Sequence, residues 1–181
     1  MRVSKEKAAE NRERILTEAA RLFREHGLAG IGVDALTHAA GLTHGSLYSQ
    51  FGSKDRLAEA AMEHALTTSS ARMRDAATLE EFVTRYLSQD HRDRRGDGCV
   101  MAALVGEMPR QAGSIRNRFT SAVRALSKRI AGFLPRGRET EDEALAVVAT
   151  LLGTLILARA VDDPTLSDRI LAATRRKLAE S

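Results

Sequence analysis

The stretch VDALTHAAGLTHGSLYSQFGSK, residues 33–54, constrains the fold more than any other part of the chain. Apolar residues recur at helical spacing over 33–40, and Gly41 suits the left-handed backbone conformation that ends many helices. Thr43 is a good N-cap for a second short helix over 44–50, because its hydroxyl can accept from a free amide of the first turn. Two short helices joined by a three-residue turn with glycine are typical of a helix-turn-helix, whose second helix reads the DNA major groove.

The second of these helices carries an exposed face without a carboxylate. Leu47 and Phe51, four residues apart, are expected to anchor it in the core. The other positions supply hydroxyls, an amide, an imidazole and a glycine, which suit contacts with phosphates and base edges. These positions are His44, Gly45, Ser46, Tyr48, Ser49 and Gln50. The alternative interpretation is a small polar surface helix that binds nothing.

A longer pattern joins this stretch to the helix before it, in register from residue 15 to residue 57. Its members are Ile15, Leu16, Ala19, Ala20, Leu22, Phe23, Gly27, Ala39, Ala40, Gly41, Leu42, Thr43, Leu47, Tyr48, Phe51, Lys54 and Leu57. The pattern resembles the N-terminal domain of TetR-family transcriptional regulators. The resemblance implies an all-α fold, with a three-helix DNA-binding domain over 1–53 and a helical ligand-binding and dimerisation domain over 54–181.

The same resemblance assigns residues to the DNA surface. They are Thr43, His44, Gly45, Ser46 and Tyr48, with Lys54 as a phosphate contact, and Gln50 lies on the same exposed rim. Two positions depart from the family pattern. His44 stands where a lysine is common, so a fixed positive charge is replaced by a group that is mostly neutral at pH 7. Gly32 stands where Ser or Thr often caps the preceding helix, so this chain lacks a hydroxyl that could contact phosphate.

Composition favours a helical protein of the cytoplasm. The chain has 181 residues, a formal net charge of +4 and only 3 prolines, and its sequence pI of about 9.6 is compatible with an anionic partner. A single cysteine excludes an intrachain disulfide and a cysteine-based zinc site. The N-terminus lacks the apolar core of a signal peptide. The most apolar stretch, 144–161, is interrupted by Thr150, Gly153, Thr154 and Arg159 and is expected to fall short of a membrane span.

Helical periodicity and breaker residues predict about nine helices in all. The first helix is expected to end at residue 26, ahead of the two short helices. Six more are expected over 54–74, 79–87, 99–105, 114–133, 140–161 and 164–180. The charged segment SQDHRDRRGDGC, residues 88–99, is most simply a solvated loop.

The helix expected over 140–161 is apolar on more than one face. Its own subunit can bury one face, so the remaining apolar surface needs another partner. A two-fold bundle with the last helix of each copy is the simplest solution, and Gly153 would permit a close approach. The alternative is that all of this surface packs within one subunit.

A group of apolar side chains in the C-terminal half is a candidate cavity lining. It consists of Phe82, Tyr86, Met101, Leu104, Met108 and Phe119. Methionines adapt to irregular ligands and a lone tyrosine hydroxyl can orient one. Such a group is more often plain core, but the family resemblance favours a pocket for a small, largely apolar effector.

Cys99 supports a sharper hypothesis. It follows Gly98 at the start of a predicted helix, with Arg92, Arg94 and Arg95 just upstream. A helix N-terminus and nearby cations both favour a reactive thiolate, so Cys99 is a candidate sensor of oxidants or electrophiles. The alternative is a small buried residue that fills space.

These features predict a dimeric, ligand-responsive repressor of an inverted-repeat operator. The rival interpretations are a helical enzyme or carrier that uses the C-terminal cavity, and a DNA binder or activator without an effector. The five histidines form no close pair, and neither a nucleophile–base constellation nor a glycine-rich phosphate loop is evident. The sequence therefore predicts no catalytic residues, no metal site and no cofactor.

Overall fold

The computed structural model is all-helical over the residues it describes, which are 5–41, 43–73, 75–135, 137 and 140–179. Leu42 of the helix-turn-helix, and the side chains of His44, Ser46 and residues 70–72, lie outside the described part. The elements are α1 Lys5–His26, α2 Val33–Ala39, α3 His44–Phe51, α4 Lys54–Arg72, α5 Leu79–Tyr86, α6 Gln89–Asp93, η1 Arg95–Asp97, α7 Val100–Leu104, η2 Met108–Arg110, α8 Gly113–Ala131, α9 Glu141–Ala160 and α10 Pro164–Ala179, where η marks a 3₁₀ helix.

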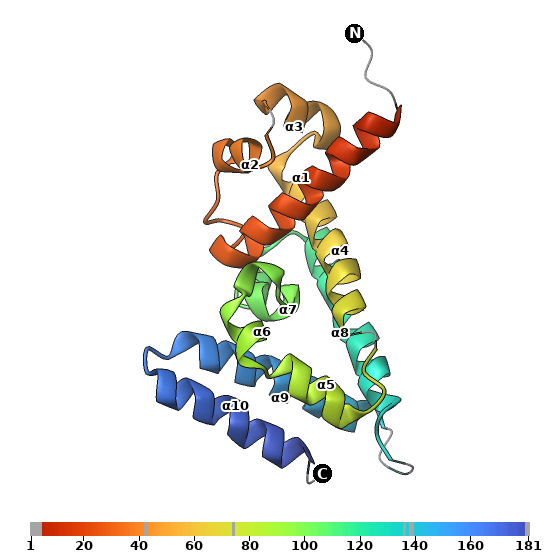
Figure 1. Cartoon of the computed structure of the whole chain (residues 1–181). Helices are drawn as coiled ribbons and strands as arrows, with labels where there is room; N and C mark the ends of the chain where they lie inside the picture. Colours follow the sequence, from red (N-terminus) through yellow and green to blue (C-terminus); the bar gives the residue numbers. More distant parts are fainter. Residues whose placement is uncertain (1–4, 42, 74, 136, 138–139, 180–181) are drawn as a thin grey trace.

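The N-terminal helices form one end of the molecule, with α2 and α3 beside the long α1 (Figure 1). Ile15, Ala19 and Phe23 form the buried stripe of α1, and they pack with Leu36 of α2 and Leu47 of α3 in one core cluster. Gly27, with φ +79°, ends α1 as predicted for a glycine C-cap. This cluster continues beyond residue 53, because it includes α4 residues and, further along the chain, side chains of α7, η2 and α8.

In the C-terminal half, α4, α5, the α6–α7 segment and α8 line a cavity. The helices α4 and α8 lie against each other along one edge, α5 crosses the far end, and α6 and α7 lie between α1 and α9 (Figure 1). A second core cluster fills the far end, where α5, α7, α8, α9 and α10 meet. Its fully buried members include Phe82, Leu87, Leu151 and Leu155.

The last two helices begin as the sequence predicts. The Thr140 hydroxyl accepts from Glu143 N at 3.2 Å, and the Asp163 carboxylate accepts from Thr165 N at 2.8 Å ahead of Pro164. Helix α9 packs between α8 and α10. By length and composition alone α9 is apolar enough to cross a membrane, contrary to expectation, although core helices of soluble proteins share this property.

The prediction of a solvated loop over 88–99 is wrong. The segment forms α6 and η1, so the described residues contain ten α-helices rather than about nine. Ser88 caps α6 by accepting from His91 N at 3.1 Å. Arg92 binds Asp168 of α10 at 2.6 Å and also contacts Ser167, so tertiary ion pairs and hydrogen bonds hold the segment. The sequence of the segment does not indicate this packing, because the partners of Arg92 lie about 75 positions away in the chain.

Candidate functional site

Two glycines and two apolar anchors fix the second helix of the helix-turn-helix. Gly41 and Gly52 adopt positive φ angles of +63° and +79°, which lets the backbone turn sharply before and after α3. Leu47 and Phe51 are buried, as expected. Arg12 of α1 lies over the Phe51 ring, 4.4 Å from its centroid, which ties α1 to the reading helix.

The outer face of α3 contains no carboxylate and is open to solvent. Thr43, Gly45 and Ser49 are exposed, Tyr48 is 50% exposed, and Gln50 is partly exposed. A Cβ added at Gly45 would meet no atom within 4 Å, so this glycine leaves the backbone accessible without being required for packing. Side chains for His44 and Ser46, also predicted on this face, are among those the structure does not describe.

Lys54 is the first residue of α4, next to the end of α3. The Ser53 hydroxyl accepts from Arg56 N at 3.1 Å and so caps this helix. The ammonium of Lys54 and the positive end of the helix dipole therefore lie together. Such a pairing suits a phosphate group.

A cavity of about 990 Å³ lies between α4, α5, the α6–α7 segment and α8. Its lining includes Phe82, Tyr86, Cys99 and Met101 of the predicted set. Leu104 and Met108 lie instead in the N-terminal core cluster, and Phe119 is half-buried between the two clusters. The sequence did not single out Met73, His91, Leu126 or Arg129 as lining residues.

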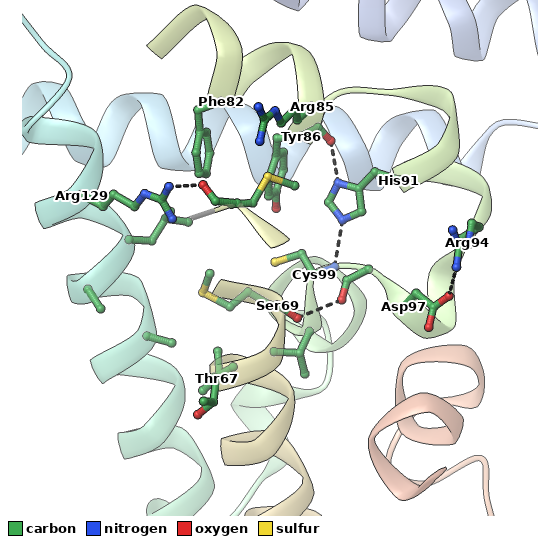
Figure 2. Close-up of a pocket in the computed structure, with 18 of the residues that line it drawn as sticks. Thr67, Ser69, Phe82, Arg85, Tyr86, His91, Arg94, Asp97, Cys99 and Arg129 are labelled. Carbon is green, nitrogen blue, oxygen red and sulfur yellow. Dashed lines mark hydrogen bonds and ion pairs between the residues drawn. The ribbon is translucent and has the colours of Figure 1, made fainter. Parts of the chain in front are cut away.

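His91 connects three elements of the cavity wall (Figure 2). Its Nε2 accepts from Cys99 N at 2.9 Å, at the start of α7. Its Nδ1 must then carry the hydrogen and donates to the carbonyl oxygen of Tyr86, 2.6 Å away at the end of α5. One neutral imidazole thus satisfies backbone groups at a helix C-terminus and a helix N-terminus.

The arginines near Cys99 differ from those inferred from the sequence. Arg92 and Arg94 pair with acidic side chains, Asp168 and Asp97 respectively, and Arg95 donates to the main-chain oxygen of Arg159. Arg159 of α9 is the buried guanidinium of this region, donating to His91 O at 2.6 Å. Burial lowers the pKa of Arg159 from its ordinary value, and charge interaction with Cys99 opposes that shift.

Gly98 makes this arrangement possible. A Cβ at this position would lie 2.8 Å from Arg159 Nη2 and 2.9 Å from the His91 ring. Only glycine fits between the guanidinium and the imidazole without displacing one of them. Cys99 itself is buried from bulk solvent but lies in the cavity wall at the N-cap of α7.

The segment that runs through the cavity wall, residues 96–107, is hydrogen-bonded on both sides of its lining residues to the N-terminal half. Arg24 of α1 donates through Nε to Gly96 O in η1 at 2.5 Å. The Glu107 carboxylate, between α7 and η2, accepts from Leu28 N at 3.0 Å and from Ala29 N at 3.3 Å. Both contacts lie at the C-terminal end of α1, the helix on which α2 and α3 pack.

Comparison with known proteins agrees with this architecture. The family model "Bacterial regulatory proteins, tetR family" matches residues 15–61, which include α2, α3 and the start of α4. The HTH-type transcriptional repressor AcnR of Corynebacterium diphtheriae is 27% identical over 158 residues, which covers 85% of this chain and 81% of that protein.

Solved structures share the fold over nearly their whole length. A TetR transcriptional regulator from Chloroflexus aurantiacus gives a TM-score of 0.81 at 22% identity and covers 97% of this chain and 98% of its own. The reduced form of Escherichia coli NemR gives a TM-score of 0.78 at 21% identity, with 94% and 96% covered. The helix-turn-helix residues, the relative and the fold agree, and together they support a TetR-family transcriptional regulator, a class of regulators rather than enzymes.

Proposed function

We propose that this protein is a cytoplasmic, homodimeric repressor that binds an inverted-repeat operator and releases it when a small, largely apolar effector occupies the cavity. Residues 1–53 form the DNA-binding domain, and 54–181 form the domain for effector binding and dimerisation. The similarity to a protein named as a transcriptional repressor supports repression over activation.

The observation that carries this proposal is the hydrogen bonding between the C-terminal end of α1 and the segment 96–107, part of which (97–101) lines the cavity. Arg24 to Gly96 O and Glu107 to Leu28 N join this segment to the helix that supports α3. An effector that shifts the α6–α7 segment therefore moves α1 and changes the separation of the two reading helices in the dimer. By linkage, operator DNA must weaken effector binding by the same factor.

On the DNA side, Tyr48 and Lys54 contact phosphates, and Gln50 reads bases together with His44 and Ser46. Thr43 and Gly45, at the start of α3, let the protein approach the DNA backbone closely. Two copies related by a two-fold axis then read two half-sites about one helical turn or more apart. The exposed, acid-free face of α3 and the position of Lys54 at the start of α4 support this assignment.

The first test is selection from a random DNA pool by the purified full-length protein. Recovery of an inverted repeat is the expected result, and Lys54→Ala should then weaken binding to all sequences and lower the salt slope by about 1. Gln50→Ala should change the preferred sequence instead. Recovery of no preferred sequence at low salt would count against the proposal.

A thiol-reactive signal is a second candidate trigger, favoured by the position of Cys99 in the cavity wall at the N-cap of α7. Addition to an electrophilic alkene forms a bond from Sγ to carbon and breaks the alkene π bond. The thiol proton ends on the neighbouring carbon, so no oxidant is needed. If Cys99→Ser protein still releases operator on treatment with N-ethylmaleimide, Cys99 is not the trigger.

A further inference from the structure

Tyr86 has a buried hydroxyl whose neighbour is the Cys99 side chain, which does not meet it in a hydrogen bond of normal geometry. The residue is 3% exposed, and its oxygen makes no hydrogen bond of normal geometry with any described residue. A buried polar group without a partner destabilises the fold, because its hydration is lost and not replaced. A group of this kind in a cavity wall therefore points to a ligand that satisfies it.

The packing of Tyr86 fixes the direction of that hydroxyl. Its ring stacks on the Phe82 ring with centroids 5.8 Å apart. It lies edge-to-face with the His91 ring, and these two centroids are 4.8 Å apart. Its main-chain oxygen is held by His91 as well. The hydroxyl points from α5 toward Cys99 on the opposite wall (Figure 2), and the ring cannot turn to find another partner without breaking these contacts.

The protonation of Tyr86 makes it a donor. Burial, and then the neighbouring Cys99 thiol, raise the pKa of Tyr86 well above its ordinary value. The phenol therefore stays neutral at physiological pH and keeps its hydrogen, so the matching ligand group is an acceptor.

The charged groups of the wall are nearly balanced. Four arginines and three carboxylates line the cavity. Arg94 pairs with Asp97 at 2.6 Å, and Arg118 pairs with Glu63 at 2.7 Å. Arg129 donates to the main-chain oxygen of Met73 and lies over the Phe82 ring, 5.2 Å from its centroid. Arg85 is exposed to solvent.

Phe82, which stacks on Tyr86, and Met101 and Leu126 are apolar members of the lining, beside the neutral imidazole of His91. A ligand anion in this part of the cavity would lose hydration and would compete with the Met73 main-chain oxygen for Arg129, the guanidinium that lies over the Phe82 ring. An uncharged acceptor on an apolar body matches both the Tyr86 hydroxyl and its surroundings.

We propose that the cavity binds an uncharged, largely apolar ligand whose carbonyl oxygen accepts a hydrogen bond from the Tyr86 hydroxyl. This inference deepens the proposed function and rests on it for its biological meaning, but its chemistry can be tested without DNA. Tyr86 selects the ligand by its acceptor, while the surrounding apolar side chains supply most of the contact area.

Three matched probes test the ligand class by titration calorimetry on the purified full-length protein. They are 2-acetylnaphthalene, 2-ethylnaphthalene and 2-naphthoate, which share the ring system and differ in the polar group. The ketone is expected to bind roughly three- to tenfold more tightly than the ethyl compound, the usual range for one hydrogen bond. The carboxylate is expected to bind most weakly.

Tyr86→Phe removes only the hydroxyl and should abolish the preference for the ketone while 2-ethylnaphthalene binds at least as well as before. Thr120→Val, which removes a hydroxyl from an exposed position of α8 outside the cavity lining, should keep the preference. Equal binding of ketone and ethyl compound to the unmodified protein overturns the inference, as does tightest binding of the carboxylate. A ketone preference that survives in Tyr86→Phe, or no binding of any probe, also overturns it.

Failure of this inference is distinct from failure of the proposed function. A protein that selects an inverted repeat and is released by other effectors, yet shows no ketone preference, refutes only the ligand class. A Tyr86-dependent ketone preference in a protein that selects no DNA sequence supports the ligand class and refutes the repressor proposal.

Discussion

At the scale of single residues, His91 does more for the structure than its exposure suggests. Its Nδ1 donates to Tyr86 O and its Nε2 accepts from Cys99 N. Main-chain groups at helix ends such as these have no partner within their own helix. The same residue lies against the Tyr86 ring and against Gly98. Its removal leaves one donor and one acceptor without their partner.

We expect His91→Phe to lower the free energy of unfolding by about 1–3 kcal/mol, because buried backbone groups lose their hydrogen bonds. His91→Gln is the matched control, since its amide supplies one donor and one acceptor, and it should retain much of the stability. Urea unfolding followed by circular dichroism measures both variants. If both lose the same stability, the bonding of the imidazole is not what holds the segment.

At the scale of elements, local signals predicted helix ends well. Gly27 and Gly41 end helices, and Thr140 and Pro164 begin them, because the capping chemistry depends only on neighbours in the chain. Helix α6 was missed because it has five residues, none buried, and its partners come from α9 and α10. The sequence of α6 itself does not indicate which residues it contacts.

The short helix α7 shows why the cavity lining was only partly predicted. Val100 and Leu104, one turn apart, pack into the N-terminal cluster, while Met101 and Ala102 pack into the other. A helix that is apolar all round lies between two cores, and its sequence does not say which face meets which core. Leu104 and Met101 are therefore indistinguishable as lining candidates until the fold is known.

Substitution of Glu107 tests whether effector binding in the cavity reaches the DNA-binding helices through α1. Its carboxylate accepts from two backbone amides after α1, so Glu107→Ala should cost about 1–2 kcal/mol of stability. The same change should reduce the effect of a saturating effector on operator affinity, because one of the two links to α1 is lost. Operator binding measured by fluorescence anisotropy, with and without effector, checks this expectation.

Glu107→Gln provides the control for charge. One amide oxygen can still accept from both Leu28 N and Ala29 N, as Oε2 of Glu107 does now. The glutamine variant should keep most of the coupling. Full coupling in the alanine variant would show that the signal takes another route, for example through the contact between α1 and α4.

At the scale of the whole molecule, α9 and α10 leave an apolar face uncovered in a single chain. Leu157 is 58% exposed, and Leu145 and Leu166 are exposed as well. Gly153 lies midway along the same helix, where an added Cβ would meet no atom within 4 Å. A second copy of this face would cover the leucines, and the glycine would let the two α9 helices approach closely.

Gly153→Leu tests whether this face of α9 meets a second copy or is exposed to solvent. The substitution should weaken a dimer but stabilise a monomer. Within one chain the new side chain meets open space, and replacing a mid-helix glycine by leucine favours the helix by up to about 1 kcal/mol. Between two chains the same side chain pushes the helices apart, so the dimer should weaken and operator binding should fall with it. Analytical ultracentrifugation over a concentration series measures the change, with Thr120→Leu on the exposed side of α8 as the control. A Gly153→Leu protein with higher thermal stability and an unchanged mass would mean that α9 does not meet a second copy at this position.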